Sequence, residues 1–169
     1  MKLMFVSDIH GSRKYLEEIK DIYDIEKPDK IIFLGDMFYG GYDSEDIMDI
    51  LDQFNNKIVI KGNCDSRYDV MTANFNFLDY YYFEEFNKKI FCSHGNLYNI
   101  SRYPDKKFDI MVSGHTHMGM IENKNGKIFL NPGSISYPRG GTVNSYLIMD
   151  NTGIYLKDLE ENIIDKLFW

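Results

Sequence analysis

The chain has 169 residues, 44% of them hydrophobic, and a formal net charge of −7. This length suits one domain with a sizeable core, so we expect a single domain over residues 1–169. The acidic balance argues against a broad basic surface for nucleic acid, and any attraction for phosphate must therefore be local.

Cysteine usage and the first residues bear on the cell compartment. Cys64 and Cys92 are too few for a disulfide framework, which fits a reducing environment. The first residues enter a strand and meet Asp8 before a signal-peptide core could form, and no apolar run reaches membrane-spanning length. We therefore expect a cytoplasmic protein without a membrane partner. The aromatic content of 15% could indicate a surface that stacks on nucleic-acid bases. We favour the explanation that an A/T-rich coding sequence produces it.

The first half of the chain alternates strand-like and helix-like segments. Near-continuous apolar runs predict strands over 2–7, 30–35 and 57–61. An amphipathic helix is expected from Arg13 to a point before Pro28, and Asp43 or Ser44 can cap a second helix. Apolar strands separated by helices indicate a parallel sheet that is covered on both faces.

The second half changes to strands joined mostly by short turns. Strand-like runs lie at 89–93, 109–113, 118–122, 127–131, 145–150 and 154–158. We expect these to form antiparallel pairs, with hairpin turns at 124–126 and 150–153, where Asn and Gly tolerate positive φ. A helix near 159–168 is expected to close the core.

Polar residues follow five of these strands, and they are the types that bind metal ions. They are Asp8, His10, Asp36, Asn63, His94, His115 and His117. All four histidines of the chain belong to this set. Because ligands of open α/β sheets bind outside the carboxyl ends of the strands, these side chains should converge on one crevice. Metal ions would offset the desolvation cost of placing polar groups there, so the pattern predicts a two-metal hydrolytic site.

The individual motifs differ in specificity. Alternation along extended backbone would place Asp8 and His10 on one side, and likewise His115 and His117, so each pair could chelate an ion. Glycines beside the ligands would remove side-chain bulk where the backbone turns sharply. Taken alone, Asn63 could be a turn residue and His94 a hydrogen-bonded strand-end histidine. Two histidines flanking one residue have few structural uses and form the strongest single motif.

The series Asp-x-His, Gly-Asp, Gly-Asn-x-Asp, His-Gly and Gly-His-x-His resembles the calcineurin-like metallophosphoesterase superfamily. The loop at 131–134 resembles its small, uncapped bacterial and archaeal phosphodiesterases. The resemblance implies an α/β fold, a four-layer α-β-β-α sandwich of two facing mixed sheets flanked by helices. It also implies two metal sites bridged by Asp36, one held by Asp8, His10, Asp36 and His117 and the other by Asp36, Asn63, His94 and His115.

This resemblance implies a metal-dependent phosphodiesterase that acts on small phosphoesters. Two divalent ions about 4 Å apart can clamp a phosphoryl group, and the expected nucleophile is a hydroxide that bridges them. The nitrogen and oxygen donors suit Mn, Fe, Co, Ni or Zn, and the resemblance makes Mn the first expectation. A phosphodiesterase is expected over a monoesterase.

Proton donation to the leaving group is the open part of this mechanism. The wider family commonly has a histidine after the Gly-Asn pair, whereas this chain has Cys64 and then Asp65. A neutral thiol is a poor proton donor to an alkoxide. Asp65 could serve, or the enzyme could favour esters whose leaving group needs little help. We therefore count Cys64 and Asp65, with Asn63 and His94, among the catalytic candidates.

Substrate contacts and competing functions rest on fewer residues. Arg102 and Arg139 follow the ligand loops and are candidates for bidentate phosphate contact, although loops also tolerate arginine for no functional reason. A second hypothesis is a catalytically idle metal-binding scaffold for protein interactions, similar to the retromer subunit of this fold. A nuclease ranks lower because there is no basic groove. A homo-oligomer through an apolar patch is a further expectation.

Overall fold

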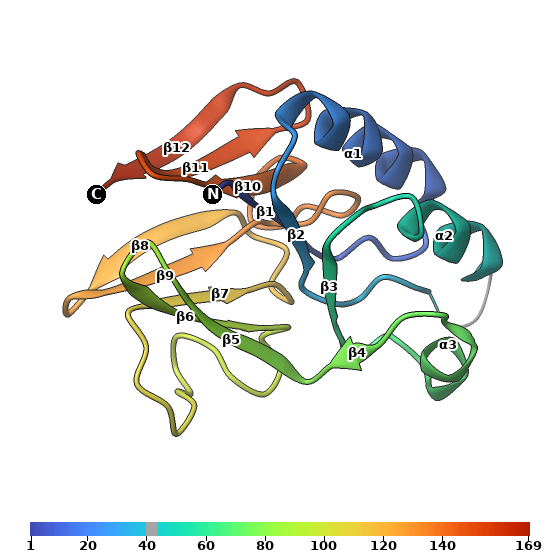
Figure 1. Ribbon diagram of the computed structural model, residues 1–169, viewed down its shortest axis with the longest axis horizontal. Coiled ribbons are helices and arrows are strands. Elements are labelled where there is room, and N and C mark those ends of the chain that lie inside the picture. The colour runs from blue at the N-terminus through green and yellow to red at the C-terminus, as the bar shows by residue number, and fades with distance from the viewer. Residues whose placement is uncertain (40–43) are drawn as a thin grey trace.

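Two mixed β-sheets face each other in the computed structural model, which describes residues 1–39 and 44–169 (Figure 1). The seven-stranded sheet contains, in spatial order, β12 (Ile163–Phe168), β11 (Gly153–Asp158), β10 (Ser145–Met149), β1 (Leu3–Val6), β2 (Lys30–Phe33), β3 (Lys57–Ile60) and β4 (Phe77–Leu78). The five-stranded sheet contains β5 (Tyr80–Glu85), β6 (Lys88–Ser93), β7 (Ile110–Ser113), β9 (Lys127–Asn131) and β8 (Met120–Lys124).

Each sheet has a parallel centre. Strands β1 to β4 pair in parallel in the first sheet, and β6, β7 and β9 pair in parallel in the second. The outer pairs, such as β5 with β6 and β10 with β11, are antiparallel. Parallel neighbours end at the same edge, so the loops after β1, β2 and β3 lie together, as do those after β6 and β7. These two groups of strand-end loops position the candidate site.

The helices cover the outer face of the seven-stranded sheet. They are α1 (Arg13–Glu26) and α2 (Ser44–Leu51), with the short α3 (Arg67–Thr72) lying near β4 (Figure 1). Helix α1 buries Leu16, Ile19 and Ile22, each contributing about 1.5–3 kcal/mol on full burial. It ends at Lys27, whose left-handed backbone donates to the carbonyl of Tyr23 at 2.9 Å. Among the described residues, no helix is long and apolar enough to cross a membrane.

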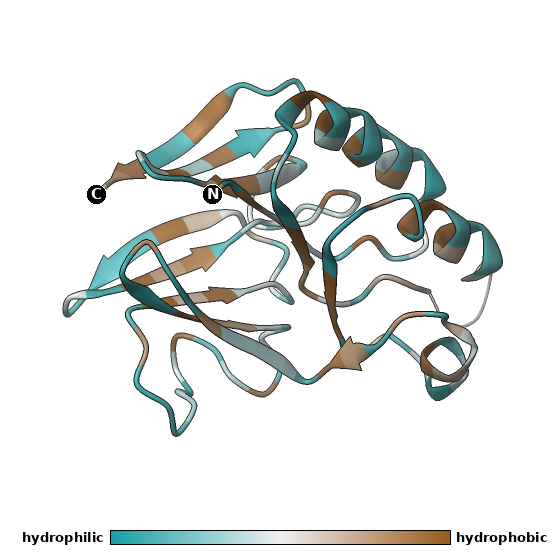
Figure 2. Ribbon diagram, viewed as in Figure 1, coloured by the Kyte–Doolittle hydropathy of each residue, from teal (hydrophilic) through white to brown (hydrophobic). Residues whose placement is uncertain are grey.

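The central strands of the first sheet, β10, β1 and β2, are almost wholly buried, and Figure 2 shows the mostly hydrophobic β2 in brown in the middle of the molecule. In β1, Met4 and Val6 join the core beneath the helices, whereas Leu3 and Phe5 join the core between the two sheets. This explains why the strand is apolar throughout. On the outer face of the second sheet, an irregular segment at 95–108 covers side chains such as Phe129.

The expected sandwich of two facing mixed sheets is confirmed, with helices on one outer face and the irregular segment on the other. The expected strands are present, and Asn125 and Gly126 adopt positive φ in the predicted β8–β9 hairpin turn. Helix α2 begins at Ser44, while the alternative cap Asp43 lies outside the described residues. The expectation of a single domain over residues 1–169 stays a prediction.

Two secondary-structure expectations are wrong. Strands β6, β7 and β9 are parallel, because the long segments between them allow crossover connections that hairpins do not. The expected C-terminal helix is strand β12, which pairs antiparallel with β11. The β-branched pair Ile163 and Ile164 favours extended backbone, and an open sheet edge supplies the partner. Helix α3 and strands β4 and β5 were not expected.

Candidate metal centre

The strand-end loops bring all seven predicted ligands into one group, which we call the ligand cluster. It consists of Asp8, His10, Asp36, Asn63, His94, His115 and His117. Each member has a ligand atom within 3.8 Å of a ligand atom of another member. Two halves of this cluster can be distinguished by their contacts, and Asp36 lies between them.

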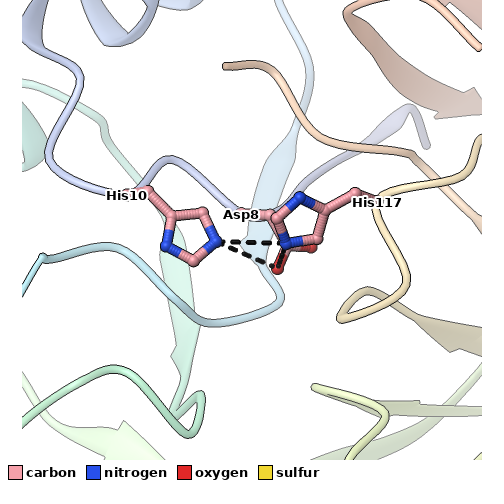
Figure 3. A group of neighbouring side chains, drawn as sticks. All are labelled: Asp8, His10 and His117. Carbon is pink, nitrogen blue, oxygen red and sulfur yellow. Dashed lines mark hydrogen bonds and ion pairs between the residues drawn. The ribbon is translucent and has the colours of Figure 1, made fainter. Parts of the chain in front are cut away.

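The first half contains Asp8, His10 and His117 (Figure 3). The Nε2 atom of His117 lies 3.2 Å from Oδ1 of Asp8 and 3.1 Å from Nε2 of His10. The Nε2 atom of His10 also lies 3.8 Å from Oδ2 of Asp36. Asp8, from the end of β1, is fully buried, and His117, from the loop after β7, is nearly so. These donor atoms point toward a common centre.

The second half contains Asp36, His94 and His115, with Asn63 beside them. The Nε2 atom of His94 lies 3.3 Å from Oδ2 of Asp36, 3.1 Å from Oδ1 of Asn63 and 3.2 Å from Nδ1 of His115. Asn63 and His115 are exposed, whereas Asp36 and His94 are buried. This half is therefore open to solvent on the Asn63 and His115 side.

The backbone at these ligands is left-handed, not extended. Asp8, His10, Asp36, His115 and His117 all have positive φ, between 48° and 68°. Such conformations are uncommon for residues with a side chain and cluster at functional sites, where surrounding structure holds them. The expectation from extended alternation is therefore corrected. Tight turns bring Asp8 and His10 into one half, whereas His115 and His117 fall in different halves.

Two glycines make room for the cluster, as expected from their positions beside ligands. A Cβ atom at Gly62 would overlap the carboxylate and main-chain nitrogen of Asp36. A Cβ atom at Gly114 would overlap Ser7 and approach the carboxylate of Asp8. The two strand-end loops can approach the carboxylates this closely only without a side chain.

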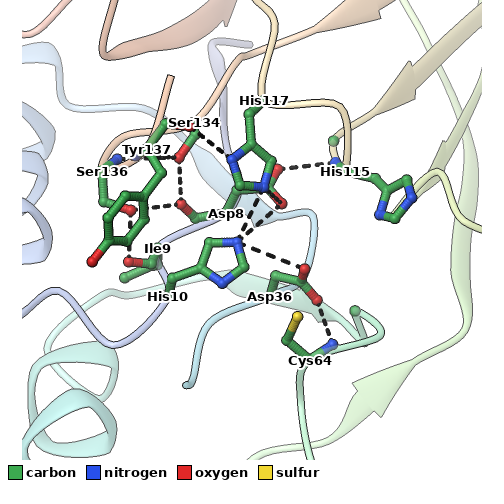
Figure 4. Close-up of polar contacts among 12 residues, drawn as sticks. Asp8, Ile9, His10, Asp36, Cys64, His115, His117, Ser134, Ser136 and Tyr137 are labelled. Atoms are coloured by element: carbon green, nitrogen blue, oxygen red, sulfur yellow. Dashed lines mark hydrogen bonds and ion pairs between the residues drawn. The ribbon is translucent and has the colours of Figure 1, made fainter. Parts of the chain in front are cut away.

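Main-chain carbonyls hold two histidines with one nitrogen toward the cluster. Nδ1 of His94 lies 2.8 Å from the carbonyl oxygen of Leu34, and Nδ1 of His117 lies 2.7 Å from that of Tyr137. A ring that donates from Nδ1 presents the lone pair of Nε2 to the cluster, which is the usual arrangement of metal-binding histidines. Ser134 and Ser136 donate to the carbonyl oxygen of Asp8 and so fix the first strand end (Figure 4).

The donor set fits divalent ions. Oδ1 of Asp8 is buried without a hydrogen-bond partner among the described residues, although Nε2 of His117 lies 3.2 Å away. A cation would satisfy this orphaned oxygen. Burial lowers the pKa of His10 and of His115, which keeps both rings neutral and able to bind a metal. Imidazole, carboxylate and amide donors without a thiolate suit first-row divalent metals.

The charges couple the carboxylates to the other two histidines. The carboxylate of Asp8, 3.2 Å from Nε2 of His117, raises the pKa of His117. Burial lowers the pKa of His94, but the nearby Asp36 outweighs it and the net shift is upward. Burial likewise raises the pKa of Asp36, and His94 reverses this to leave the carboxyl strongly acidic. Asp36 is therefore a carboxylate at any physiological pH. A residue that is to bind metal ions in both halves of the cluster needs this negative charge.

The two candidate proton donors have different surroundings. The main-chain nitrogen of Cys64 donates to Oδ1 of Asp36 at 2.7 Å, and burial together with Asp36 raises the pKa of the thiol to about 12. Asp65 is buried, and its two oxygens accept hydrogen bonds from four main-chain nitrogens. Burial raises the pKa of Asp65 against these bonds, and both of its oxygens are occupied by main-chain donors. The geometry favours a positioning role for Asp65.

Among the described residues, two cavities border the cluster. The tyrosine cavity has a volume of about 580 Å³ and is lined by His10, Tyr39, His117, Ser136, Tyr137, Pro138 and Arg139. The apolar cavity has a volume of about 330 Å³, borders His115, and is lined by Ile100, Met118, Met120 and Phe129 among others. Of the two arginine candidates, Arg139 therefore lies beside the cluster. Arg102 is exposed in a turn paired with Asn99 and is not among the described lining residues.

Sequence reasoning did not find the tyrosines or serines of this region. The high aromatic content, explained by base composition, did not single out Tyr39. Ser134 and Ser136 act through their hydroxyls on the backbone of Asp8, a contact across more than 120 residues that sequence spacing does not show. The available indication was the resemblance of the loop at 131–134.

Comparisons with known proteins agree with this geometry. Residues 1–153 match the family model of the calcineurin-like phosphoesterase superfamily domain. Over 163 residues the chain is 34% identical to phosphodiesterase YfcE of Escherichia coli (strain K12), covering 89% of this chain and 88% of that relative. The structure of the E. coli phosphoesterase Yfce has a TM-score of 0.91 and 29% identity over 99% of both chains. Vacuolar Protein Sorting 29 from Cryptosporidium parvum shares the fold, with a TM-score of 0.70 and 22% identity over 99% of this chain and 98% of that one.

Proposed function

Because the chain belongs to the calcineurin-like phosphoesterase superfamily, we propose that it is a phosphodiesterase that uses two divalent metal ions bound by the ligand cluster. The observation that carries the proposal is the convergence of the seven ligands, with Asp36 between the two halves and the orphaned oxygen of Asp8 among the donors. Residues that follow strands of both sheets have few structural reasons to assemble in this way.

The residues divide into two sets of ligands. Asp8, His10, Asp36 and His117 would hold one ion, and Asp36, Asn63, His94 and His115 would hold the other. When bound, the pair of ions supplies activation of water and stabilisation of charge on the phosphoryl oxygens. The carbonyls of Leu34 and Tyr137 keep His94 and His117 in the tautomer that this binding needs.

Two observations concern the substrate. Arg139 lines the tyrosine cavity, and a guanidinium group can bind two phosphoryl oxygens with two parallel hydrogen bonds. Each half of the cluster also borders its own cavity, so the two ester groups of a diester have separate places to bind. A monoester needs only one such place, and this difference supports a diesterase.

Further details of the proposal rest on chemistry alone. Manganese is the first choice of metal, with Fe, Co, Ni and Zn also compatible with the donors. A cytoplasmic location is supported by the free thiols of Cys64 and Cys92. We also propose that the chain is one domain that binds small phosphoesters, and that it forms a homo-oligomer through exposed apolar side chains such as Ile163 and Phe168.

The test is turnover of bis(p-nitrophenyl) phosphate with added Mn²⁺. We expect Asp36→Asn and His94→Ala to abolish turnover and to lower the metal content measured by mass spectrometry. Asp105→Asn, an exposed carboxylate away from the cluster, serves as the control and should retain both. Wild-type protein that binds two ions but turns over no diester would refute the proposal and favour the metal-binding scaffold.

A further inference from the structure

The tyrosine cavity presents two aromatic rings to solvent next to the ligand cluster. Tyr39 is 66% exposed and Tyr137 is 57% exposed, although the rings of both side chains lie near that of His10. Their ring centroids lie 6.5 Å and 5.9 Å from that of His10, and each ring plane is inclined by 72° to the imidazole. Both rings therefore stand at a steep angle to the imidazole, and more than half of each tyrosine side chain is open to solvent.

Tyr137 is placed with particular precision by its main chain. Its nitrogen donates to Oγ of Ser134 at 2.8 Å, and its carbonyl oxygen accepts from Nδ1 of His117 at 2.7 Å. Ser134 in turn donates to the carbonyl of Asp8 at 2.7 Å. The same hydrogen bonds that orient two ligands thus fix the backbone of the tyrosine. An aromatic surface held this firmly beside a reactive centre has a defined position relative to the substrate.

The remaining lining residues also suit a flat apolar group with an anion at one end. Ser136 donates to the carbonyls of Asp8 and Ile9, so its hydroxyl hydrogen is engaged within the protein. Pro138 adds apolar surface, and Arg139 supplies a cation that can contact an anion or stack on a ring. The volume of about 580 Å³ lies within the range of small-ligand sites and exceeds what a phosphate alone requires.

We propose that the tyrosine cavity binds a planar aromatic substituent of the phosphoester, such as an aryl group or a nucleobase, between Tyr39 and Tyr137. This inference rests on the proposed phosphoesterase function and names the substrate class of that site. Stacking on tyrosine contributes to the binding affinity whatever hydrogen-bonding groups the ligand carries, because every aromatic group has a π face. The cavity therefore selects an aromatic class and does not discriminate strongly among its members.

The experiment compares two anions that differ only in the group on phosphorus. Binding of phenylphosphonate and of methylphosphonate to the Mn²⁺-loaded protein is measured by titration calorimetry, which needs no turnover. Stacking predicts that the wild type binds phenylphosphonate about tenfold or more tightly than methylphosphonate. Tyr137→Leu and Tyr39→Leu should each reduce this ratio several-fold. Tyr137→Phe retains the ring and should retain the ratio.

Tyr68→Leu is the matched control, since Tyr68 is 63% exposed on α3 and is not among the described residues of the cavity. Its ratio should equal that of the wild type. Equal affinities of the wild type for the two phosphonates, or failure to bind either, would overturn the inference. So would an unchanged ratio in both leucine variants. Hydrolysis of bis(p-nitrophenyl) phosphate by the same preparations judges the proposed function separately.

Discussion

Oδ2 of Asp65 lies 3.0 Å from the main-chain nitrogen of Asp36 and thereby links the loop after β3 to the carboxylate shared by both halves of the cluster. The carboxylate of Asp65 also accepts hydrogen bonds from the main-chain nitrogens of Met37 and Phe38, at 2.8 Å and 3.1 Å, and from that of Gly62, at 2.7 Å. Four main-chain donors that would otherwise be buried without an acceptor are satisfied by one side chain. Asp65 therefore holds this part of the site in place.

Removing the carboxylate of Asp65 should destabilise the fold and also impair the site. We expect Asp65→Ala to lower the free energy of unfolding by about 2–4 kcal/mol, because several buried main-chain donors lose their acceptor. Activity should fall as Asp36 loses its fixed position. Urea denaturation provides the measurement, with Asp21→Ala, an exposed residue of α1, as the control. An Asp65→Ala protein as stable as Asp21→Ala would contradict the assignment.

The ligand residues were predictable because their identities and their strand-end context are local properties of the sequence. Apolar runs located the strands, and the residue types after them indicated metal chemistry. The route of the backbone was not predictable in the same way. Left-handed conformations at Asp8 and Asp36 depend on contacts with distant loops, such as the approach of Gly62 to Asp36. Extended alternation is consequently a poor guide at these turns.

The errors in the fold have a related cause. Strands β6 and β7 are separated by an irregular segment, and the sequence alone does not show that this segment covers the outer face of the sheet. The C-terminal stretch has helix-compatible residues, but pairing with β11 decides its conformation. Partner strands that are distant in sequence determine both outcomes, so single-sequence periodicity did not resolve them.

Cys64 should make the enzyme dependent on good leaving groups. With its pKa raised to about 12 by burial and by Asp36, the thiol is a weak proton donor to a departing alkoxide. We expect rates on a series of substituted phenyl diesters to fall steeply as the leaving-group pKa rises. Cys64→His should flatten this dependence and raise the rate on the poorest leaving group by about tenfold or more, since a positioned acid contributes roughly 10²–10⁴-fold.

The control for this change is Cys64→Ser, which offers no better acid and should retain the steep dependence. Metal content should be measured for each variant, because the sulfur lies close to His10 and Asp36. A shallow dependence in the wild type would show that another group already protonates the leaving oxygen.

Arg139 and Arg102 are predicted to differ in their effect on substrate binding. Arg139 lines the tyrosine cavity, and its main-chain nitrogen donates to the carbonyl of His117 at 3.0 Å. Arg139→Ala should raise the KM for diesters about tenfold, as expected for the loss of a charge-assisted contact of roughly 1.5 kcal/mol. Arg102→Ala, outside that cavity, is the comparison and should leave KM within about twofold of the wild type. Equal KM values in the two variants would exclude this role for Arg139.

Glu26 joins the end of α1 to the seven-stranded sheet through two lysines. Its carboxylate bonds to Nζ of Lys157 and, at 3.0 Å, to Nζ of Lys2, and its side chain is 9% exposed. Burial raises the pKa of Glu26, but the hydrogen bonds and charges of Lys157 and Lys2 outweigh it, and the net shift is downward. The folded state therefore binds a proton less readily than the unfolded state, so stability depends on pH.

Glu26→Gln should reveal this dependence directly. The free energy of unfolding is expected to fall by about 1–3 kcal/mol at pH 7, because two charge-assisted hydrogen bonds lose their anion. A lowered pKa contributes stability that is complete above the ordinary value of about 4.5 and is lost as the pH falls through the folded-state value. The difference between wild type and variant should therefore shrink toward zero in urea denaturations carried out below pH 4.5. Glu17→Gln, which affects only the exposed pair with Arg13, should leave the stability close to that of the wild type throughout the pH series. A Glu26→Gln difference that stays constant across the series would contradict the ionic origin of this contact.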